Sequence, residues 1–292
     1  MKTTLLGSLG NINKHTVPRL VADGHDVTVI TSSPERVAAI EALGAKALVG
    51  SMSDSVFLTH SLRGSDVVYL MISGAPAGDL MESVKNQAEI FKMAVHAAEI
   101  KNVVLLSSIG AQNPDAGILY MYHYTENALS SLLSDINLAI IRPVGFYNNL
   151  FGDLQTIKTA KIIYSSVPAD VQRKWVDPSD IAELQYQFLT ALPAGKTIKY
   201  VVSDTASGND WLDALKENGL EVNYQLISDD AVKENLLKAG FSEANAENYM
   251  KMSAAQRRPD AFYEDIEKIG FHQGKVKLAD FAKIFAGAYK VQ

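Results

Sequence analysis

The sequence predicts an α/β fold, with a doubly wound parallel sheet and a smaller, mainly helical α/β lobe at the C-terminus. The first half of the 292-residue chain alternates short apolar runs with stretches of helical periodicity, the order expected of βαβ units. The apolar runs are nearly continuous, as in strands covered on both faces. The first run leads into a turn with two glycines and then a helix, a pattern typical of dinucleotide-binding units.

The predicted strands of the first half are short and rich in valine, isoleucine and leucine. They cover residues 3–6, 27–30, 47–49, 67–72, 103–106 and 138–141. Helical candidates lie between them, at residues 14–23, 34–43, 53–62, 79–100 and 120–133. Pro18 falls inside the first of these and lacks a backbone N–H, so we expect that helix to start late or to bend.

After residue 150 the chain becomes more polar and less regular. A helix is expected near Asp180, with Asp177 or Ser179 as its N-cap. Other strands are expected at residues 199–203 and 221–227, and other helices at 210–218, 229–239, 243–252 and 280–289. We therefore predict two domains, a nucleotide-binding domain at 1–150 and a substrate or partner lobe at 151–292, some segments of which can join the main sheet.

Composition argues against several classes of function. The chain has no cysteine, which rules out disulfides and thiolate metal sites, and its histidines lack the spacing of metal ligands, so no metal is expected. A net charge of −6 with interleaved acids and bases offers no basic surface for direct nucleic-acid contact. There is no signal-peptide pattern, and no apolar run approaches the roughly 18 residues of a membrane span. We expect a cytoplasmic protein without a membrane partner.

The glycine turn is the first candidate binding site. Its residues expected to contact a dinucleotide are Gly7, Ser8, Leu9, Gly10, Asn11 and Ile12, because backbone N–H groups at a helix start can face a pyrophosphate. Asn13 stands where the third glycine of the fingerprint is expected, and its side chain either contributes to the site or obstructs it. The alternative is that both glycines serve only the turn.

The end of the second predicted strand bears on the choice between NAD and NADP. It reads Thr31-Ser32-Ser33 and is followed, after two residues, by Arg36. No acidic residue is present to hold the ribose hydroxyls of NAD, whereas Ser32 and Arg36 suit a 2′-phosphate, which favours NADP. The competing interpretation is a helix start with Ser33 as N-cap.

Residues that follow the other strands complete the predicted site, because ligands bind beyond the carboxyl ends of parallel strands. Ser73, Gly74 and Ser108 are expected at the cofactor, although serine and glycine are also ordinary strand-exit residues. An aromatic set is expected to line a cleft for a flat or apolar substrate: Tyr120, Tyr124, Phe146 and Tyr147.

Several motifs occur in one order along the first 202 residues. They are Gly7-x-x-Gly10, the strand exit at 106–111, the helix with Tyr124, Ile141-Arg-Pro143 and Trp175-Val-Asp177-x-x-Asp180. Together they resemble the NmrA-like family of atypical short-chain dehydrogenases, which includes NAD(P)H-dependent quinone reductases and redox-sensing regulators. The resemblance implies a Rossmann-like domain that binds NAD(P) at the carboxyl edge of its sheet, and a C-terminal lobe that closes over a substrate cleft.

The proton-transfer pair of standard short-chain dehydrogenases, a tyrosine with a lysine four residues later, is absent. The residues four positions after Tyr120, Tyr122 and Tyr124 are Tyr, Glu and Ala, so the catalytic residues are unassigned. The first hypothesis is an oxidoreductase that moves hydride from NAD(P)H to an apolar acceptor such as a quinone, which needs positioning more than a dedicated acid. The alternatives are a non-catalytic redox sensor that acts through a protein partner and a scaffold with a degenerate site. A homodimer is compatible with each.

Overall fold

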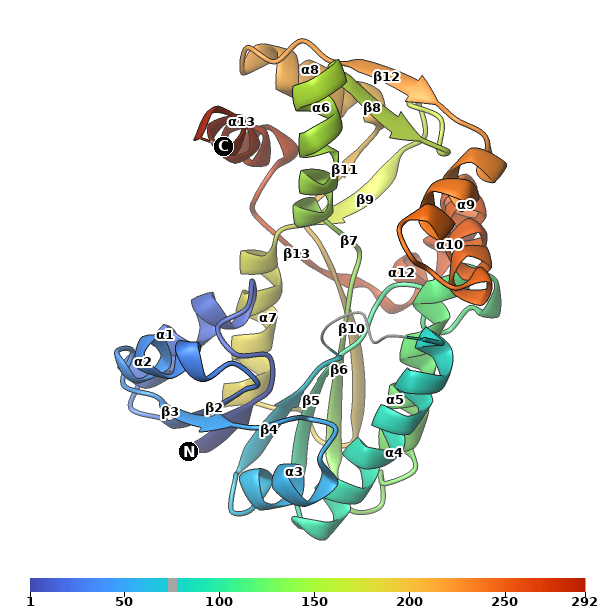
Figure 1. The fold of residues 1–292 in the computed structure, drawn as a ribbon. Coiled ribbons are helices and arrows are strands. Elements are labelled where there is room, and N and C mark those ends of the chain that lie inside the picture. The colour runs from blue at the N-terminus through green and yellow to red at the C-terminus, as the bar shows by residue number, and fades with distance from the viewer. Residues whose placement is uncertain (73–77, 292) are drawn as a thin grey trace.

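The structure, a computed structural model, describes residues 1–72 and 78–291 and is built on one eight-stranded parallel sheet (Figure 1). The strand order is β13-β10-β6-β5-β4-β1-β2-β3. These strands are β1 (Lys2–Leu5), β2 (Asp26–Thr31), β3 (Lys46–Val49), β4 (Val67–Leu70), β5 (Asn102–Leu106), β6 (Asn137–Pro143), β10 (Lys196–Val202) and β13 (Phe271–Gln273). The predicted fold class is therefore confirmed.

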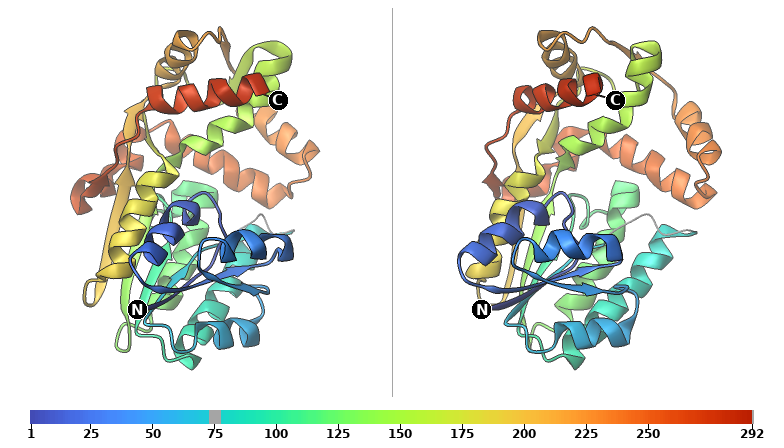
Figure 2. Two further views of the ribbon diagram at one scale, coloured as in Figure 1. Left: turned by 90° about the vertical axis from the view of Figure 1, so that its left-hand side faces the viewer. Right: turned by 60° about the vertical axis from the view of Figure 1, so that its left-hand side comes forward.

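Two hydrophobic cores lie on opposite faces of this sheet, because successive strand residues point to opposite sides. Ala139 and Ile141 of β6 face one core, while Leu138 and Ile140 face the other. The first core is covered by α1 (Asn13–Ala22), α2 (Val37–Glu41) and α7 (Pro178–Thr190). The short η1 (Pro34–Arg36), which has no buried residue, precedes α2. The second is covered by α3 (Ser55–Leu62), α4 (Leu80–Ala97) and α5 (Tyr122–Ser130), which η2 (Pro114–Met121) precedes. Figure 2 shows α1 and α7 side by side on the first face.

The C-terminal lobe lies beyond the carboxyl ends of the main strands (Figure 1). Its strands form two small sheets, one from β7 (Gly145–Phe146), β9 (Arg173–Val176) and β11 (Asp204–Ala206), the other from β8 (Ile162–Ser165) and β12 (Asn223–Leu226). Its helices are η3 (Tyr147–Asp153), α6 (Leu154–Ala160), α8 (Gly208–Glu217), α9 (Asp229–Lys238), α10 (Glu243–Gln256), α11 (Pro259–Phe262), α12 (Glu264–Ile269) and α13 (Leu278–Val291).

An aromatic cluster forms the core of this lobe. The Tyr147 ring stacks on Trp175 with centroids 6.2 Å apart and on Phe281 with centroids 5.2 Å apart. Trp211 meets the Phe285 ring edge to face at 5.2 Å. Offset and edge-to-face contacts of this kind add stability beyond the buried area itself.

Local expectations and observed elements differ in a few places. α1 begins at Asn13 and contains Pro18, so the late start, one of the two expected alternatives, was wrong. The single helix expected at 34–43 is a short 3₁₀ turn followed by α2, and Ser33 occupies the N-cap position without a side-chain capping bond. Asp177, rather than Ser179, caps α7, because its Oδ1 accepts from the Ser179 N–H at 2.9 Å.

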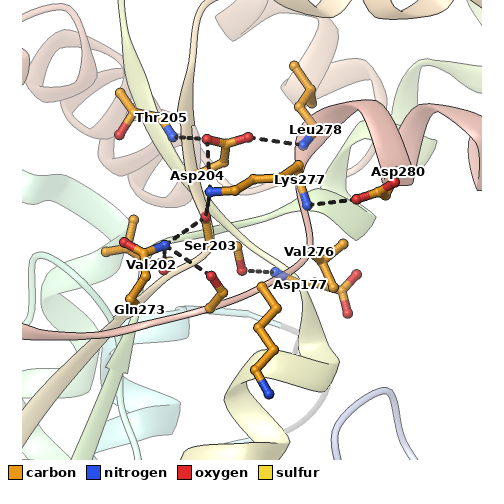
Figure 3. A network of polar contacts seen from close by, with 12 residues as sticks. Asp177, Val202, Ser203, Asp204, Thr205, Gln273, Val276, Lys277, Leu278 and Asp280 are labelled. Carbon is orange, nitrogen blue, oxygen red and sulfur yellow. Dashed lines mark hydrogen bonds and ion pairs between the residues drawn. The ribbon is translucent and has the colours of Figure 1, made fainter.

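A polar network joins the lobe to the main sheet where β10 passes into β11 (Figure 3). The buried Asp180 carboxylate accepts hydrogen bonds from the backbone N–H groups of Lys275 and Val276 and from the Ser203 hydroxyl, at 2.6–3.1 Å. Lys277 donates to the Ser203 carbonyl at 2.9 Å. The segment that leads into α13 is thereby fixed against the first turn of α7.

The main sheet does not stop at residue 150. β10 pairs with β6 from Lys196 to Val201, and β13 pairs with β10. Segments of the C-terminal half thus complete the nucleotide-type sheet, and the two-domain division stays a prediction. Among residues 1–72 and 78–291, no helix has the length and apolarity needed to cross a bilayer.

Candidate dinucleotide site and substrate cleft

The candidate site begins at the point where the strand order reverses. β1 lies between β4 and β2, so the chain builds the sheet outward in one direction through β2 and β3 and in the other through β4, β5 and β6. In open α/β sheets, ligands bind in the crevice at such a switch point. The glycine turn follows β1 directly, while the predicted residues Ser73 and Gly74 lie outside the described residues.

The turn needs its glycines for backbone reasons. Gly7 has φ +96°, a left-handed conformation that suits glycine. A Cβ at Gly7 would lie 2.4 Å from the Met71 sulfur, and one at Gly10 would lie 3.0 Å from the Gly7 carbonyl oxygen. The Gly10 N–H donates to that same carbonyl at 3.1 Å. The chain therefore turns tightly into α1 with bare backbone facing the crevice.

Asn13 is buried beneath this turn and supports it through hydrogen bonds of its side chain, which does not project into the crevice. The side chain is 2% exposed, and its amide nitrogen donates to the carbonyl oxygens of Leu6 and Ser8, both at 2.8 Å. Its Oδ1 accepts from the Gln185 side chain of α7 at 2.9 Å. Because both amide protons are used within the protein, Asn13 has none to give a phosphate. The residue that replaces the third glycine therefore links the turn and the start of α1 to α7 through buried hydrogen bonds.

A hollow of about 290 Å³ lies over the turn and the end of β2. Five predicted cofactor residues line it: Gly7, Ser8, Gly10, Ser32 and Arg36. Of the other three in the turn, Leu9 packs against the core, Asn11 is exposed and Ile12 is buried. No acidic residue is among the described lining residues.

Two observations show that the hollow fits a dinucleotide phosphate. The Ser8 hydroxyl is buried and has no hydrogen-bond partner among the described residues, and buried hydroxyls normally have one. Ser32 and Arg36 are exposed at the rim of the hollow, beside Thr31, whose hydroxyl accepts from the Ser33 N–H at 3.1 Å. These residues would hold the pyrophosphate and the adenosine end of the cofactor.

A larger cleft of about 570 Å³ separates the carboxyl ends of β5 and β6 from the C-terminal lobe. The predicted residues Ser108 and Phe146 line it. Its other walls are mainly apolar and include Leu80, Ile109, Ile118, Leu119, Met121, Val144, Met252 and Phe262. A cleft with these walls is suited to a largely apolar small molecule.

The structure places the other predicted cleft residues elsewhere. Tyr147 is fully buried in the aromatic core of the lobe. Tyr124 faces a separate surface hollow with Lys85, and Tyr120 stacks on His123 with centroids 4.6 Å apart. Tyr122, which lies between them in the sequence, lines the cleft instead.

Tyr249 and Tyr263 also line the cleft and come from the far end of the chain. The sequence has no motif that marks them, because they reach the cleft only through the packing of α10 and α11. Burial raises the pKa of Tyr122 and of Tyr249, with the neighbouring Tyr249 phenol adding to the effect on Tyr122. Both rings therefore remain neutral phenols that can donate a hydrogen bond.

Glu126, four residues after Tyr122, occupies the place of the usual lysine. Its carboxylate is buried and accepts from Arg142 Nε at 2.9 Å and Arg142 Nη2 at 2.7 Å. Arg142 also donates to Tyr200 at 2.9 Å and to Asp265 at 3.1 Å. This paired network fixes α5 to β6, β10 and α12, so Glu126 serves to position the helix that carries Tyr122.

A glycine turn at the switch point of a parallel sheet, next to an apolar cleft, defines a dinucleotide-binding α/β protein. A family model described as NAD(P)H-binding matches residues 7–184, more than half of the chain. The chain belongs to this NAD(P)H-binding family, and NAD(P) is confirmed as its cofactor class. Within the described residues, no group of three or more His, Cys, Asp or Glu side chains is placed to hold a metal ion.

One curated relative is 26% identical over 184 residues, which is 63% of this chain and 61% of that protein. It is a (4-alkanoyl-5-oxo-2,5-dihydrofuran-3-yl)methyl phosphate reductase from Streptomyces griseus subsp. griseus. The chain thus matches only about 61% of the length of this relative.

Solved structures share the whole fold at low identity. A nucleoside-diphosphate-sugar epimerase from Staphylococcus aureus has a TM-score of 0.79 at 15% identity, over 97% of this chain and 100% of that chain. An NADPH-dependent quinone oxidoreductase from Escherichia coli, complexed with NADPH, has a TM-score of 0.77 at 18% identity, over 97% and 99%. The triphenylmethane reductase of a Citrobacter species has a TM-score of 0.78 at 17% identity, over 98% and 100%.

Proposed function

We propose that the protein is an NAD(P)H-dependent reductase that transfers hydride to a small, largely apolar acceptor such as a quinone. The observation that carries this proposal is that the phosphate-type hollow and the apolar cleft lie along the same carboxyl edge of the sheet. Bound along this edge, the cofactor supplies hydride from its nicotinamide ring. The family match and the reductase names of the curated relative and of two structural neighbours support the same class of reaction.

The chain's own residues provide the conditions that such a transfer needs. The apolar walls of the cleft exclude water and hold a flat ring in place. Tyr122 and Ser108, which both have a hydroxyl group, line this cleft. The Tyr122 phenol, which burial keeps protonated, donates a hydrogen bond to an acceptor oxygen that gains electron density.

The rim of the hollow supports NADP over NAD. Arg36 is exposed and, in the described part of the chain, makes no ion pair, and Ser32 lies beside it. A guanidinium and a hydroxyl suit the 2′-phosphate of NADP.

We therefore expect Arg36→Ala to weaken NADPH binding about 10- to 100-fold and to leave NADH binding unchanged. Arg63→Ala, which removes an exposed arginine directly after α3, controls for loss of net charge. An equal loss of affinity for both cofactors would contradict the preference.

Dinucleotide titration followed by turnover assays tests the proposal. The purified protein is titrated with NADPH, NADH, NADP and NAD, and consumption of the reduced cofactor is then followed with a panel of quinones. Binding with turnover is the expected result, and Tyr122→Phe should lower kcat. No binding at millimolar concentration would refute both an enzyme and a redox sensor. Binding without turnover would favour the alternative of a redox sensor that acts through a protein partner.

The cytoplasmic location and the homodimer expected from the sequence stay predictions.

A further inference from the structure

Arg173 has an arrangement that the proposed hydride transfer does not require. It lies at the start of β9 and lines both the substrate cleft and a smaller cavity of about 160 Å³ in the lobe. Its Nε is buried and has no hydrogen-bond partner among the described residues. In the part of the chain that the structure describes, no carboxylate forms an ion pair with its guanidinium. The side chain as a whole is half-buried, but a buried donor without an acceptor is costly.

The guanidinium is held in place by aromatic stacking. Its central carbon lies 4.6 Å from the centroid of the Trp175 ring, within the range of a cation–π contact. Trp175 itself is fixed, because its indole N–H donates to the Ala206 carbonyl at 3.1 Å and its ring stacks on Tyr147. The aromatic contact orients Arg173 but provides no hydrogen-bond acceptor for its N–H groups, and Nε has none among residues 1–72 and 78–291.

The other charges near Arg173 form no ion pair with it in the described part of the chain, although the Asp153 charge does interact with it. Asp153 lines the smaller cavity, beyond ion-pair distance. Lys174, the other cation in the cleft, has its own partner, because its Nζ lies 3.5 Å from a Glu267 oxygen. The described residues that line the cleft include no aspartate or glutamate. Of the two described cations that line the cleft, Arg173 is therefore the one without an ion-pair partner for an entering anion to displace.

We propose that Arg173 binds an anionic group of the substrate, a phosphate monoester or a carboxylate, while the apolar part of the substrate lies against Ile109 and Phe146 near Ser108. A planar guanidinium can hold either group through two parallel hydrogen bonds. The identity of this ligand as the substrate rests on the proposed reductase function. The class of acceptor is then an apolar ring or chain with an anion at one end.

Three matched aromatic probes test the anion site without any redox step: 1-naphthyl phosphate, 1-naphthoate and neutral 1-naphthol. Affinities are measured by titration calorimetry in a phosphate-free buffer, on the full chain saturated with NADP. We expect at least one anionic probe to bind about 10- to 100-fold more tightly than 1-naphthol, and the tighter anion identifies the group. Arg173→Met should remove this preference, and Arg173→Lys should retain part of it.

Lys268→Met is the matched control, because it removes one exposed cation from the same lobe without touching the cleft. It should keep the preference for the anion. Equal affinity for charged and neutral probes, or a preference that survives in Arg173→Met, would overturn the proposal. A failure of the reductase function would appear separately, as NADPH that no acceptor consumes.

Thermal unfolding shows whether the variant is folded and provides a second readout. Because the buried Arg173 Nε has no hydrogen-bond partner among the described residues, Arg173→Met should have a Tm equal to or above that of the wild type. The anionic probe should raise the Tm of the wild type and leave that of Arg173→Met unchanged. A rise of the same size in both proteins would contradict the assignment.

Discussion

At the scale of single residues, Asn13 shows how a departure from a motif can preserve its structure. Glycine at this position normally allows close approach of the backbone. Here the side chain turns inward and hydrogen-bonds the turn itself. The cofactor-facing surface stays free of side chains, because Gly7 and Gly10 provide it.

Restoring the fingerprint should therefore harm the protein. Asn13→Gly leaves the carbonyls of Leu6 and Ser8 and the Gln185 amide without their partner, and we expect a loss of about 2–4 kcal/mol in the free energy of unfolding. NADPH affinity should fall, because the turn loses its support. Urea denaturation and NADPH titration measure the two effects. A gain in affinity of tenfold or more would mean that Asn13 obstructs the site.

Asp153 gives a pH dependence of stability. Burial raises its pKa from 3.8 to about 6, although the nearby Arg173 charge acts in the opposite direction. A pKa that is higher in the folded state favours the protonated form, so this stabilisation is complete below about pH 4 and is lost as the pH rises through about 6. Asp153→Asn should raise the free energy of unfolding by about 1–2 kcal/mol at pH 8 relative to its effect at pH 4.

Urea denaturation of the wild type and of Asp153→Asn at pH 4 and pH 8 measures this difference. The exposed Asp170→Asn serves as the control for loss of a surface charge. An effect of the same size at both pH values would show that the Asp153 carboxyl is not perturbed by burial.

At the scale of elements, the first turn of α7 has two aspartates with different tasks. Asp177 caps the helix, whereas Asp180 is buried and binds two backbone N–H groups of the segment before α13. The same sequence motif thus contains one residue that caps the helix locally and one that hydrogen-bonds a segment about 95 residues later in the chain. Only the first can be recognised from neighbouring residues.

Alanine substitutions should separate these two tasks. Asp177→Ala removes one cap and should cost about 1 kcal/mol. Asp180→Ala leaves the Lys275 and Val276 N–H groups and the Ser203 hydroxyl without an acceptor, and should cost about 3–5 kcal/mol. Chemical denaturation of both variants, with helicity followed by circular dichroism, compares them. Equal losses would contradict the long-range role of Asp180.

At the scale of the whole molecule, the sheet makes the two halves of the chain interdependent. β6 is covered at its edge by β10 across Lys196 to Val201, and α7 packs on the face that α1 and α2 share. Both elements lie after residue 150. The nucleotide-binding half therefore depends on the second half for one sheet neighbour and for part of its core.

A chain cut after residue 150 should fail to fold. It retains β1 to β6 but exposes the edge of β6 and the apolar surface under α7, so we expect aggregation or a chain without cooperative unfolding. The full chain should unfold in one calorimetric transition. Two well-separated transitions, or a stable 1–150 fragment, would instead support independent domains.

The local pattern predicted much of the fold because strand burial and capping depend on neighbouring residues. Strands such as 103–106 and 138–141 were identified by continuous apolar character, and the hollow by Gly7, Gly10, Ser32 and Arg36. The cleft was harder to predict. Tyr122 was missed in favour of Tyr120 and Tyr124, because the helix phase depends on the 3₁₀ turn that precedes α5.

The sequence by itself determined the parallel α/β fold, the glycine turn and the absence of the tyrosine–lysine pair, since these depend on residue type and short spacing. The tertiary structure decided the inward direction of Asn13, the tyrosines that line the cleft and the lack, among the described residues, of an ion-pair partner for Arg173. Each of these depends on contacts between residues far apart in the chain, such as Asn13 with Gln185 or Arg173 with its lobe. Spacing along the sequence does not reveal which distant group will be the hydrogen-bond partner of a buried donor or acceptor, or whether it will have a partner at all.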